Sequence, residues 1–204
     1  METRIEAVLF DWGGVLIDNP ASGLMAFCAE ALGVSVEDYI GAHNACGEAF
    51  QKGLIPERVF WQRVCERLAC PTPRQASLWG EAFRAVYSPR EEVFGLARGL
   101  RRQGYRTSLL SNTEAPAMEF FLELGYDAFD AATFSCAEGV AKPQREIYEI
   151  ATRKLGLAPA QCVFIDDKLE FVEGARAAGM KGILYQNLDQ VRGDLTASGI
   201  RLNA

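Results

Sequence analysis

Two hydrophobic patterns alternate along most of this chain. Short continuous apolar runs, such as residues 5–10 and 162–165, are typical of strands buried on both faces of a parallel sheet. Weaker runs of the same kind occur at 107–110, 132–135 and 182–185. Segments with apolar residues three or four positions apart lie between these runs and predict helices. Strands alternating with helices indicate an α/β fold built on a doubly wound parallel sheet.

Residues 19–88 break this alternation, because they contain helical patterns and no convincing strand. We therefore expect an α/β core domain formed by residues 1–18 and 89–204, with an all-helical cap subdomain, residues 19–88, inserted between its two parts. Two connections to the core would let the cap move as a lid. Four helical patterns are expected in the cap, the first ended by Gly33, the second capped by Ser35, and the third and fourth opened by Pro56 and Pro73.

Composition narrows the range of partners. The chain has 204 residues, 49% of them hydrophobic and 24% charged, and a net charge of −6, which argues against nucleic acid as the main partner. No apolar run is long enough to span a bilayer, and charged residues interrupt the N-terminal segment, so we expect no membrane partner and a cytoplasmic protein. The six cysteines show no metal-ligand spacing, and we expect no disulfides. Monomer and homodimer both remain open.

Polar side chains occur at four places at or just beyond the ends of predicted strands. Each alone has an ordinary explanation, such as a turn cap or a solvated loop lysine. The carboxyl ends of parallel strands, however, lie at one edge of the sheet, where ligands bind. We therefore expect these side chains to meet there: Asp11, Ser111 with Asn112, Lys142, and Asp166 with Asp167.

The charges of this group indicate what it holds. Three carboxylates in one pocket repel one another, and a divalent cation together with Lys142 would neutralise them. Mg²⁺ suits carboxylates and backbone carbonyls and keeps coordination sites for a phosphate oxygen. Ser111, Asn112 and the backbone amides around Gly13 add donors for phosphate. The pocket therefore fits a phosphate monoester, with Asp11 attacking phosphorus to give an aspartyl-phosphate.

Four sequence motifs, FDWGGVL, LLSNT, GVAKPQREIY and VFIDDKLEFVEGARAAG, resemble those of the haloacid dehalogenase superfamily and occur in the same order. The chain looks like the phosphatases of that superfamily with a helical cap after the first motif. The run GEAFQKGLIPERVFW, together with LSNT, is similar to bacterial α-D-glucose-1-phosphate phosphatases. The resemblance implies a nucleophile at Asp11 assisted by Lys142, Mg²⁺ ligands from Asp11, Gly13, Asp166 and Asp167, and phosphate contacts from Gly14, Ser111, Asn112 and Lys142.

Two positions depart from the family pattern. Gly13 stands where most of these phosphatases have a general-acid aspartate, and Phe171 stands where the family often has asparagine. The first departure leaves three functions open. The chain is expected to be a magnesium-dependent phosphatase of a small phosphorylated metabolite, such as a sugar phosphate and especially an anomeric one, with His43 or Glu48 as alternative proton donors. A 2-haloacid dehalogenase and a non-catalytic module that binds phosphorylated ligands are the alternatives.

Overall fold

A five-stranded parallel sheet lies at the centre of the structure, a computed structural model that describes residues 3–202. The strands lie in the order β3-β2-β1-β4-β5, and every neighbouring pair is parallel. The predicted doubly wound α/β fold is therefore confirmed. The strands are β1 (Ala7–Phe10), β2 (Arg106–Ser111), β3 (Ala131–Phe134), β4 (Cys162–Asp166) and β5 (Lys181–Leu184).

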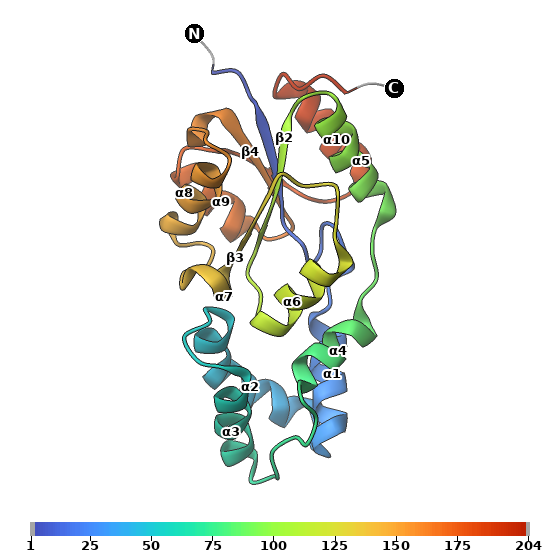
Figure 1. Ribbon diagram of the computed structural model, residues 1–204, viewed down its shortest axis with the longest axis vertical. Helices are drawn as coiled ribbons and strands as arrows, with labels where there is room; N and C mark the ends of the chain where they lie inside the picture. The colour runs from blue at the N-terminus through green and yellow to red at the C-terminus, as the bar shows by residue number, and fades with distance from the viewer. Residues whose placement is uncertain (1–2, 203–204) are drawn as a thin grey trace.

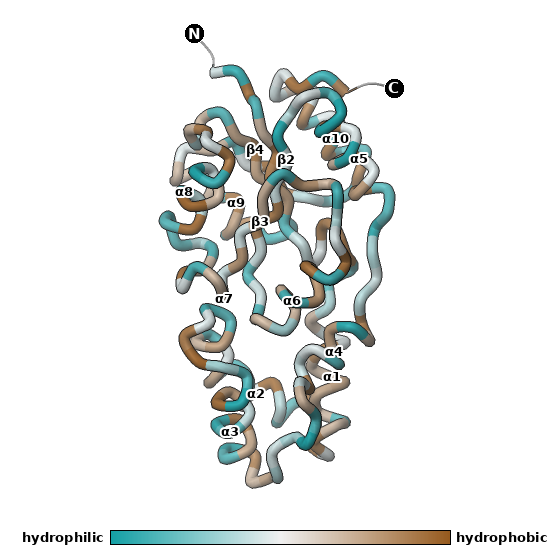
Figure 2. The backbone as a smooth tube through the Cα atoms, in the orientation of Figure 1, coloured by the Kyte–Doolittle hydropathy of each residue, from teal (hydrophilic) through white to brown (hydrophobic). Residues whose placement is uncertain are grey.

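Helices cover both faces of this sheet. Alternate residues of β1 enter different hydrophobic clusters, Val8 and Phe10 on one face and Ala7 and Leu9 on the other, and all four are fully buried. Figure 1 shows α8 and α9 beside one face and α5 and α10 beside the other. Figure 2 shows hydrophobic colour along the strands that these helices enclose. The helices are α5 (Glu91–Arg102), α8 (Arg145–Lys154), α9 (Leu169–Ala177) and α10 (Leu188–Ala197), with a short 3-10 helix, η1 (Pro159–Gln161), before β4.

Four further helices gather beyond the carboxyl ends of the strands (Figure 1). Their interior is aromatic: the rings of Phe50 and Phe60 stack with centroids 4.6 Å apart, and Trp61 lies edge-on to Phe60 at 4.8 Å. All three side chains are buried, as expected for core residues of this segment. We refer to these helices as the helical segment: α1 (Ala21–Leu32), α2 (Val36–Gln51), α3 (Glu57–Leu68) and α4 (Leu78–Val86).

Local sequence signals set most of the helix ends. Gly33 follows α1 with φ of 67°, and the Ser35 hydroxyl accepts a hydrogen bond from the Asp38 amide at the start of α2. The prediction that Pro73 opens the fourth helix is wrong. That helix begins at Leu78, because Ser77 supplies the side-chain acceptor for the Gly80 amide, at 3.0 Å, that a proline cannot supply.

The two connections between the sheet and the helical segment run side by side. The Asp18 amide donates to the Ser88 carbonyl at 2.9 Å, and the Arg90 amide donates to the Leu16 carbonyl at 2.9 Å. The Arg90 guanidinium pairs with Asp18 at 2.9 Å and donates to the Gly14 carbonyl at 2.6 Å. One side chain thus links both connections to the turn after β1.

Two features of the remaining chain bear on the composition argument. Among the described residues, no helix is long and apolar enough to cross a membrane. The six cysteines, all of them inside 3–202, are free thiols.

Two helices remain, α6 (Ala115–Leu124) and α7 (Ser135–Glu138). They lie between the sheet and the helical segment (Figure 1).

Candidate active site

A tight turn after β1 begins the site. The Asp11 amide donates to the Ile165 carbonyl at 2.9 Å, so Asp11 continues the central strand by one residue. The chain then turns through Gly13 and Gly14, and Gly14 has a φ of 90°. A Cβ atom on Gly14 would lie 2.2 Å from Oδ2 of Asp167. Glycine is therefore required at this position, both for the backbone angle and for the close approach of the loop after β4.

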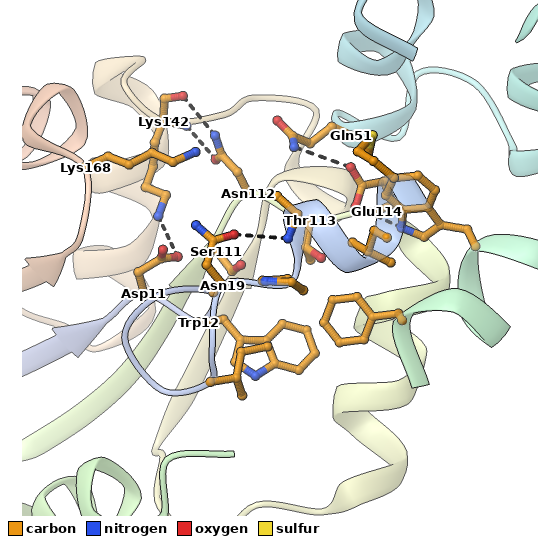
Figure 3. A pocket seen from close by; sticks show the side chains of 18 of the residues that line it. Asp11, Trp12, Asn19, Gln51, Ser111, Asn112, Thr113, Glu114, Lys142 and Lys168 are labelled. Atoms are coloured by element: carbon orange, nitrogen blue, oxygen red, sulfur yellow. Dashed lines mark hydrogen bonds and ion pairs between the residues drawn. The ribbon is translucent and has the colours of Figure 1, made fainter. Parts of the chain in front are cut away.

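Lys142 lies between two buried carboxylates. Its Nζ is 2.7 Å from Oδ1 of Asp11 and 2.6 Å from Oδ2 of Asp166, and it donates to the Leu110 carbonyl at 3.2 Å. The lysine side chain is 1% exposed, so its charge is shielded from water. Residues from the ends of β1, β2 and β4 and from the loop before α8 thus meet at one point, as the topology predicts. The bond from Lys142 to Asp11 is visible in Figure 3.

Asn112 fixes the backbone of this lysine. Its side-chain amide donates to the Lys142 carbonyl at 3.0 Å and accepts from the Lys142 amide at 2.8 Å. Both sides of the Asn112 amide are therefore engaged with the lysine loop, which gives this residue a positioning role that the sequence did not reveal. Ser111, the last residue of β2, is buried and lines the cavity described below, as Asn112 does. Their contacts with phosphate stay predictions.

Burial of so many charges shifts their pKa values. Burial raises the pKa of Asp11 to about 7; the Lys142 ammonium opposes this shift, and the Asp166 carboxylate adds to it. The pKa of Asp167 is also raised, first by burial and then by Asp166. Burial lowers the pKa of Lys142, but the attraction of Asp11 and Asp166 outweighs it and leaves the pKa above its ordinary value. The cluster therefore holds more negative charge than one lysine neutralises.

The same cluster fits a hard divalent cation. Asp11, Asp166 and Asp167 each offer a carboxylate oxygen, and these atoms lie within 4.8 Å of one another. Oδ1 of Asp167 is buried and has no hydrogen-bond partner. A buried carboxylate oxygen without a partner is costly unless something binds it. Oxygen ligands in this number are what Mg²⁺ takes, and Gly13, whose carbonyl is a further candidate ligand, lines the adjoining cavity.

The cavity in front of Asp11 has a volume of about 210 Å³ and lies between the sheet edge and the helical segment. Its wall is partly apolar, where Trp12, Leu24, Met25 and Phe83 contribute side chains. Figure 3 shows how the polar side chains enter it from Asp11 and Lys142 at one side to Gln51 and Glu114 at the other. The other polar lining residues are Asn19, His43, Ser111, Asn112, Thr113 and Lys168.

The sequence did not single out Glu114, Gln51 and Lys168. Two of them carry a signal that was available: Glu114 follows Asn112 by two positions after the same strand, and Lys168 follows the acidic pair directly. Gln51 carries no such signal, because only the packing of α2 against the sheet domain brings it to the cavity.

The structure places the two alternative proton donors differently. Glu48 is wrong for that role, because its side chain is 80% exposed, is paired with Lys52 at 2.6 Å, and is not among the residues that line the cavity. A glutamate on the outer side of α2 cannot reach the substrate. His43 does line the cavity, where it is packed among aromatic rings rather than solvated.

Phe171 places an aromatic ring where the family often has the side-chain amide of asparagine. The Nζ atoms of Lys142 and Lys168 lie 4.9 and 5.1 Å from the centroid of its ring. Cation–π attraction to both ammonium groups therefore supports the lysines that flank the acidic pair.

A parallel α/β sheet whose strand ends hold paired carboxylates around a buried lysine defines the class of Rossmann-like enzymes that bind their ligands at the sheet edge. Residues 5–179 match the model of the haloacid dehalogenase-like hydrolase family. The chain belongs to this family and is therefore an enzyme of the hydrolase type.

Individual relatives agree with this assignment. The chain is 30% identical to a sesquiterpene phosphatase of Aspergillus oryzae over 90% of its own length and 91% of that protein. It is 37% identical to flavin mononucleotide hydrolase 1 of Arabidopsis thaliana over 76% of its length, but spans only 62% of that relative. A HAD family enzyme of Bacteroides thetaiotaomicron, solved in complex with magnesium and inorganic phosphate, shares the fold with a TM-score of 0.71 and 22% identity, covering 89% of this chain and 94% of that one.

Proposed function

We propose that the protein is a magnesium-dependent phosphatase that hydrolyses a small phosphorylated metabolite through an aspartyl-phosphate on Asp11. One observation carries the proposal: Asp11 is bonded to a buried lysine and shares a carboxylate cluster with Asp166 and Asp167. Relatives named as phosphatases support the same reaction type. The proposed roles follow from where each side chain lies.

In this mechanism an Asp11 oxygen attacks phosphorus as the bond between phosphorus and the leaving oxygen breaks, and the leaving oxygen takes its proton from water. A second water molecule later hydrolyses the acyl phosphate, which releases phosphate and restores the Asp11 carboxylate. Lys142 holds the attacking carboxylate in place and attracts the phosphoryl oxygens through its positive charge. Ser111, Asn112 and the backbone around Gly14 contribute hydrogen-bond donors. Asp11, Asp166, Asp167 and the Gly13 carbonyl would hold Mg²⁺, which when bound neutralises charge on the transferring phosphoryl group.

The substrates we favour have a leaving oxygen that departs without much help from a general acid. The general-acid position is a glycine, and a Cβ atom at Gly13 would lie 3.0 Å from Cδ of Pro20, so the proline ring occupies part of the space that a longer side chain would need. A general acid is typically worth a factor of about 10²–10⁴ in rate. An anomeric hydroxyl, which is more acidic than an ordinary alcohol, depends less on such an acid. We therefore propose a sugar phosphate, and an anomeric one in particular.

Residues 19–88 are proposed to act as the cap of the core domain formed by 1–18 and 89–204. This segment supplies one wall of the cavity, including Leu24, His43 and Trp79, while the sheet edge supplies Asp11. Its two adjacent connections would allow a hinge motion that admits substrate and then excludes water from the acyl phosphate.

The first experiment measures p-nitrophenyl phosphate hydrolysis by the wild type with Mg²⁺ and with a chelator, and by Asp11→Asn with Mg²⁺. We expect turnover that requires Mg²⁺ and disappears in Asp11→Asn. A rate insensitive to chelator together with halide release from a 2-haloacid would establish the dehalogenase instead. Phosphate binding without turnover across a broad panel of phosphorylated metabolites would establish the binding module.

A second comparison tests the leaving group. Without a general acid, the enzyme should prefer substrates whose leaving hydroxyl is more acidic. In that case kcat/KM is higher for glucose 1-phosphate, which has an anomeric leaving group, than for glucose 6-phosphate. Equal values, or a preference for the 6-phosphate, would contradict this selection while leaving the phosphatase activity intact.

A further inference from the structure

The end of the cavity remote from Lys142 contains polar groups that the phosphoryl-transfer mechanism does not use. Glu114 comes from the sheet domain, directly before α6, while His43 and Gln51 come from α2. In Figure 3 the labelled Gln51 and Glu114 side chains meet on the opposite side of the cavity from Asp11. The same cavity includes Asp11, so it offers a leaving group attached to a phosphate at Asp11 room to extend toward this end.

Glu114 is a buried carboxylate with two neutral donors. Its side chain accepts from the Trp79 indole at 3.1 Å and from the Gln51 amide at 3.4 Å, and the residue is 7% exposed. Burial raises its pKa to about 7. A carboxylate has about four lone-pair positions, so each oxygen of Glu114 retains acceptor capacity beyond these two bonds. A ligand hydroxyl can use that capacity.

The imidazole of His43 is packed among aromatic rings and lies near the side-chain amide of Asn44. Its ring stacks on Trp79 with an interplanar angle of 8° and a centroid distance of 5.5 Å, and Phe60 lies edge-on to it at 5.8 Å. A Cβ atom on Gly47 would lie 3.0 Å from Cε1 of the ring, so the glycine leaves the space that the imidazole occupies. Both ring nitrogens are buried and have no hydrogen-bond partner.

An imidazole in this state is suited to binding a hydroxyl group. Burial lowers the pKa of His43 below its ordinary value, with the nearby Asn44 side chain opposing the shift, so burial favours the neutral ring. A neutral imidazole offers one donor and one acceptor, which is what a hydroxyl group also offers. The N–H of a neutral imidazole is a very weak acid, so His43 does not replace the missing general acid.

We propose that His43, Gln51 and Glu114 form a subsite that binds the hydroxyl groups of a polyhydroxylated leaving group. The proposal rests on the proposed phosphatase function and specifies its substrate class. The apolar wall near Trp12 and Phe83 covers the carbon faces of the leaving group, while the three polar side chains bind its oxygens. His43 is the specificity-determining member, because it belongs to α2 and has the unsatisfied nitrogens.

The main competing occupant is an apolar alcohol, the kind of leaving group suggested by the name of the sesquiterpene phosphatase relative. Such a group would cover the aromatic wall but leave the His43 nitrogens and the spare acceptor positions of Glu114 without partners. A buried polar group left without a partner weakens binding. The polar subsite therefore favours a hydroxylated leaving group over an apolar one.

The test compares substrates of similar size with and without hydroxyl groups. Wild type, His43→Phe and His43→Asn are assayed with glucose 1-phosphate, cyclohexyl phosphate and geranyl phosphate. His43→Phe keeps an aromatic ring against Trp79 but removes both polar atoms, and His43→Asn keeps a donor and an acceptor. We expect His43→Phe to lose at least about tenfold more kcat/KM on glucose 1-phosphate than on cyclohexyl phosphate, with part of the loss restored in His43→Asn.

Glu48→Gln is the matched control, because Glu48 lies on the same helix and points away from the cavity. It should leave kcat/KM unchanged for all three substrates. Equal losses by His43→Phe on glucose 1-phosphate and cyclohexyl phosphate would overturn the subsite, as would a wild-type preference for geranyl phosphate over a panel of hexose, pentose and glycerol phosphates. Thermal unfolding of each variant separates a folding defect from a binding defect.

The p-nitrophenyl phosphate assay separates failure of the subsite proposal from failure of the proposed phosphatase function. Wild-type hydrolysis of p-nitrophenyl phosphate with Mg²⁺ establishes the phosphatase whatever the subsite binds. Without that hydrolysis the proposed function itself is wrong, and the subsite proposal falls with it.

Discussion

Gly14 and Asp167 approach each other so closely that a single methyl group on the glycine would lie 2.2 Å from a carboxylate oxygen. This approach joins the turn after β1 to the loop after β4, the two loops that carry the carboxylate cluster. The position of Asp167, and with it the proposed magnesium site, therefore depends on the absence of a side chain at residue 14.

We expect Gly14→Ala to abolish magnesium-dependent activity. The substitution forces Asp167 to move and places alanine at a φ of 90°, where a left-handed backbone costs roughly 1–2 kcal/mol. Gly33→Ala is the control, since Gly33 also has a positive φ of 67° but no atom would lie within 4 Å of its Cβ. Both variants should lose stability in denaturant titrations, and only Gly14→Ala should lose activity. Activity in Gly14→Ala at normal Mg²⁺ concentration would contradict the role of this contact.

Removing the buried lysine should destabilise the protein in a way that Mg²⁺ partly reverses. Lys142→Met leaves Asp11 and Asp166 buried without their counter-charge, and breaking a buried pair in this way costs about 3–5 kcal/mol. A cation bound by the carboxylates would restore part of this loss. Urea unfolding with and without Mg²⁺ measures both effects.

Lys154→Met controls for loss of a lysine in general, because Lys154 forms a partly exposed pair with Glu138. It should cost at most about 1 kcal/mol and show no added dependence on Mg²⁺. A Lys142→Met variant as stable as wild type without metal would show that the carboxylates do not need the lysine.

Glu114 should make stability depend on pH between about 4.5 and 7. Its pKa is raised from 4.5 to about 7 in the folded protein, so the folded state binds more protons than the unfolded state in this window. The stability associated with Glu114 is therefore fully present below pH 4.5 and is lost as the pH rises toward 7. Glu114→Gln removes this dependence, and its stability relative to wild type should rise across the window by up to about 3 kcal/mol.

Unfolding free energies at half-unit pH steps test this expectation. Glu48→Gln is the matched control. Lys52 lowers the pKa of the exposed Glu48, so its contribution to stability changes with pH only below about 4.5, and its removal should not alter the pH dependence from 4.5 to 7. A stability difference between Glu114→Gln and wild type that stays constant from pH 4.5 to 7 would show that Glu114 keeps its ordinary pKa.

Arg90 should affect magnesium binding without contacting the metal. Its guanidinium donates to the Gly14 carbonyl at 2.6 Å and pairs with Asp18, so it fixes the turn that carries Asp11 and Gly13. Groups that orient metal ligands typically change metal affinity by about tenfold or more. We expect Arg90→Met to raise the half-activating Mg²⁺ concentration by about tenfold. Arg84→Met, which removes a partly exposed pair with Glu123 and a contact with the Phe120 ring but no contact with the turn after β1, should leave it unchanged.

The sequence predicted the sheet because strands such as β1 and β4 are continuous apolar runs, and parallel topology then placed Asp11, Lys142 and Asp166 at one edge. It did not predict the far end of the cavity. Gln51 and Glu114 are 63 positions apart and belong to different parts of the fold, so their contact depends on how the helices pack. The start of α4 was also misplaced, because a proline is a weaker helix signal than the hydroxyl of Ser77.

The backbone hydrogen bond between the Asp18 amide and the Ser88 carbonyl has a consequence for how this protein can be altered. The chain departs from the sheet and returns to it at neighbouring points, so the proposed cap, residues 19–88, is joined to the sheet at one place. A short turn joining these points would close the remaining chain without displacing a strand. If residues 19–88 act as the proposed cap, exchanging them between homologues would alter the side chains that face the leaving group and leave Asp11, Lys142 and Asp166 in place.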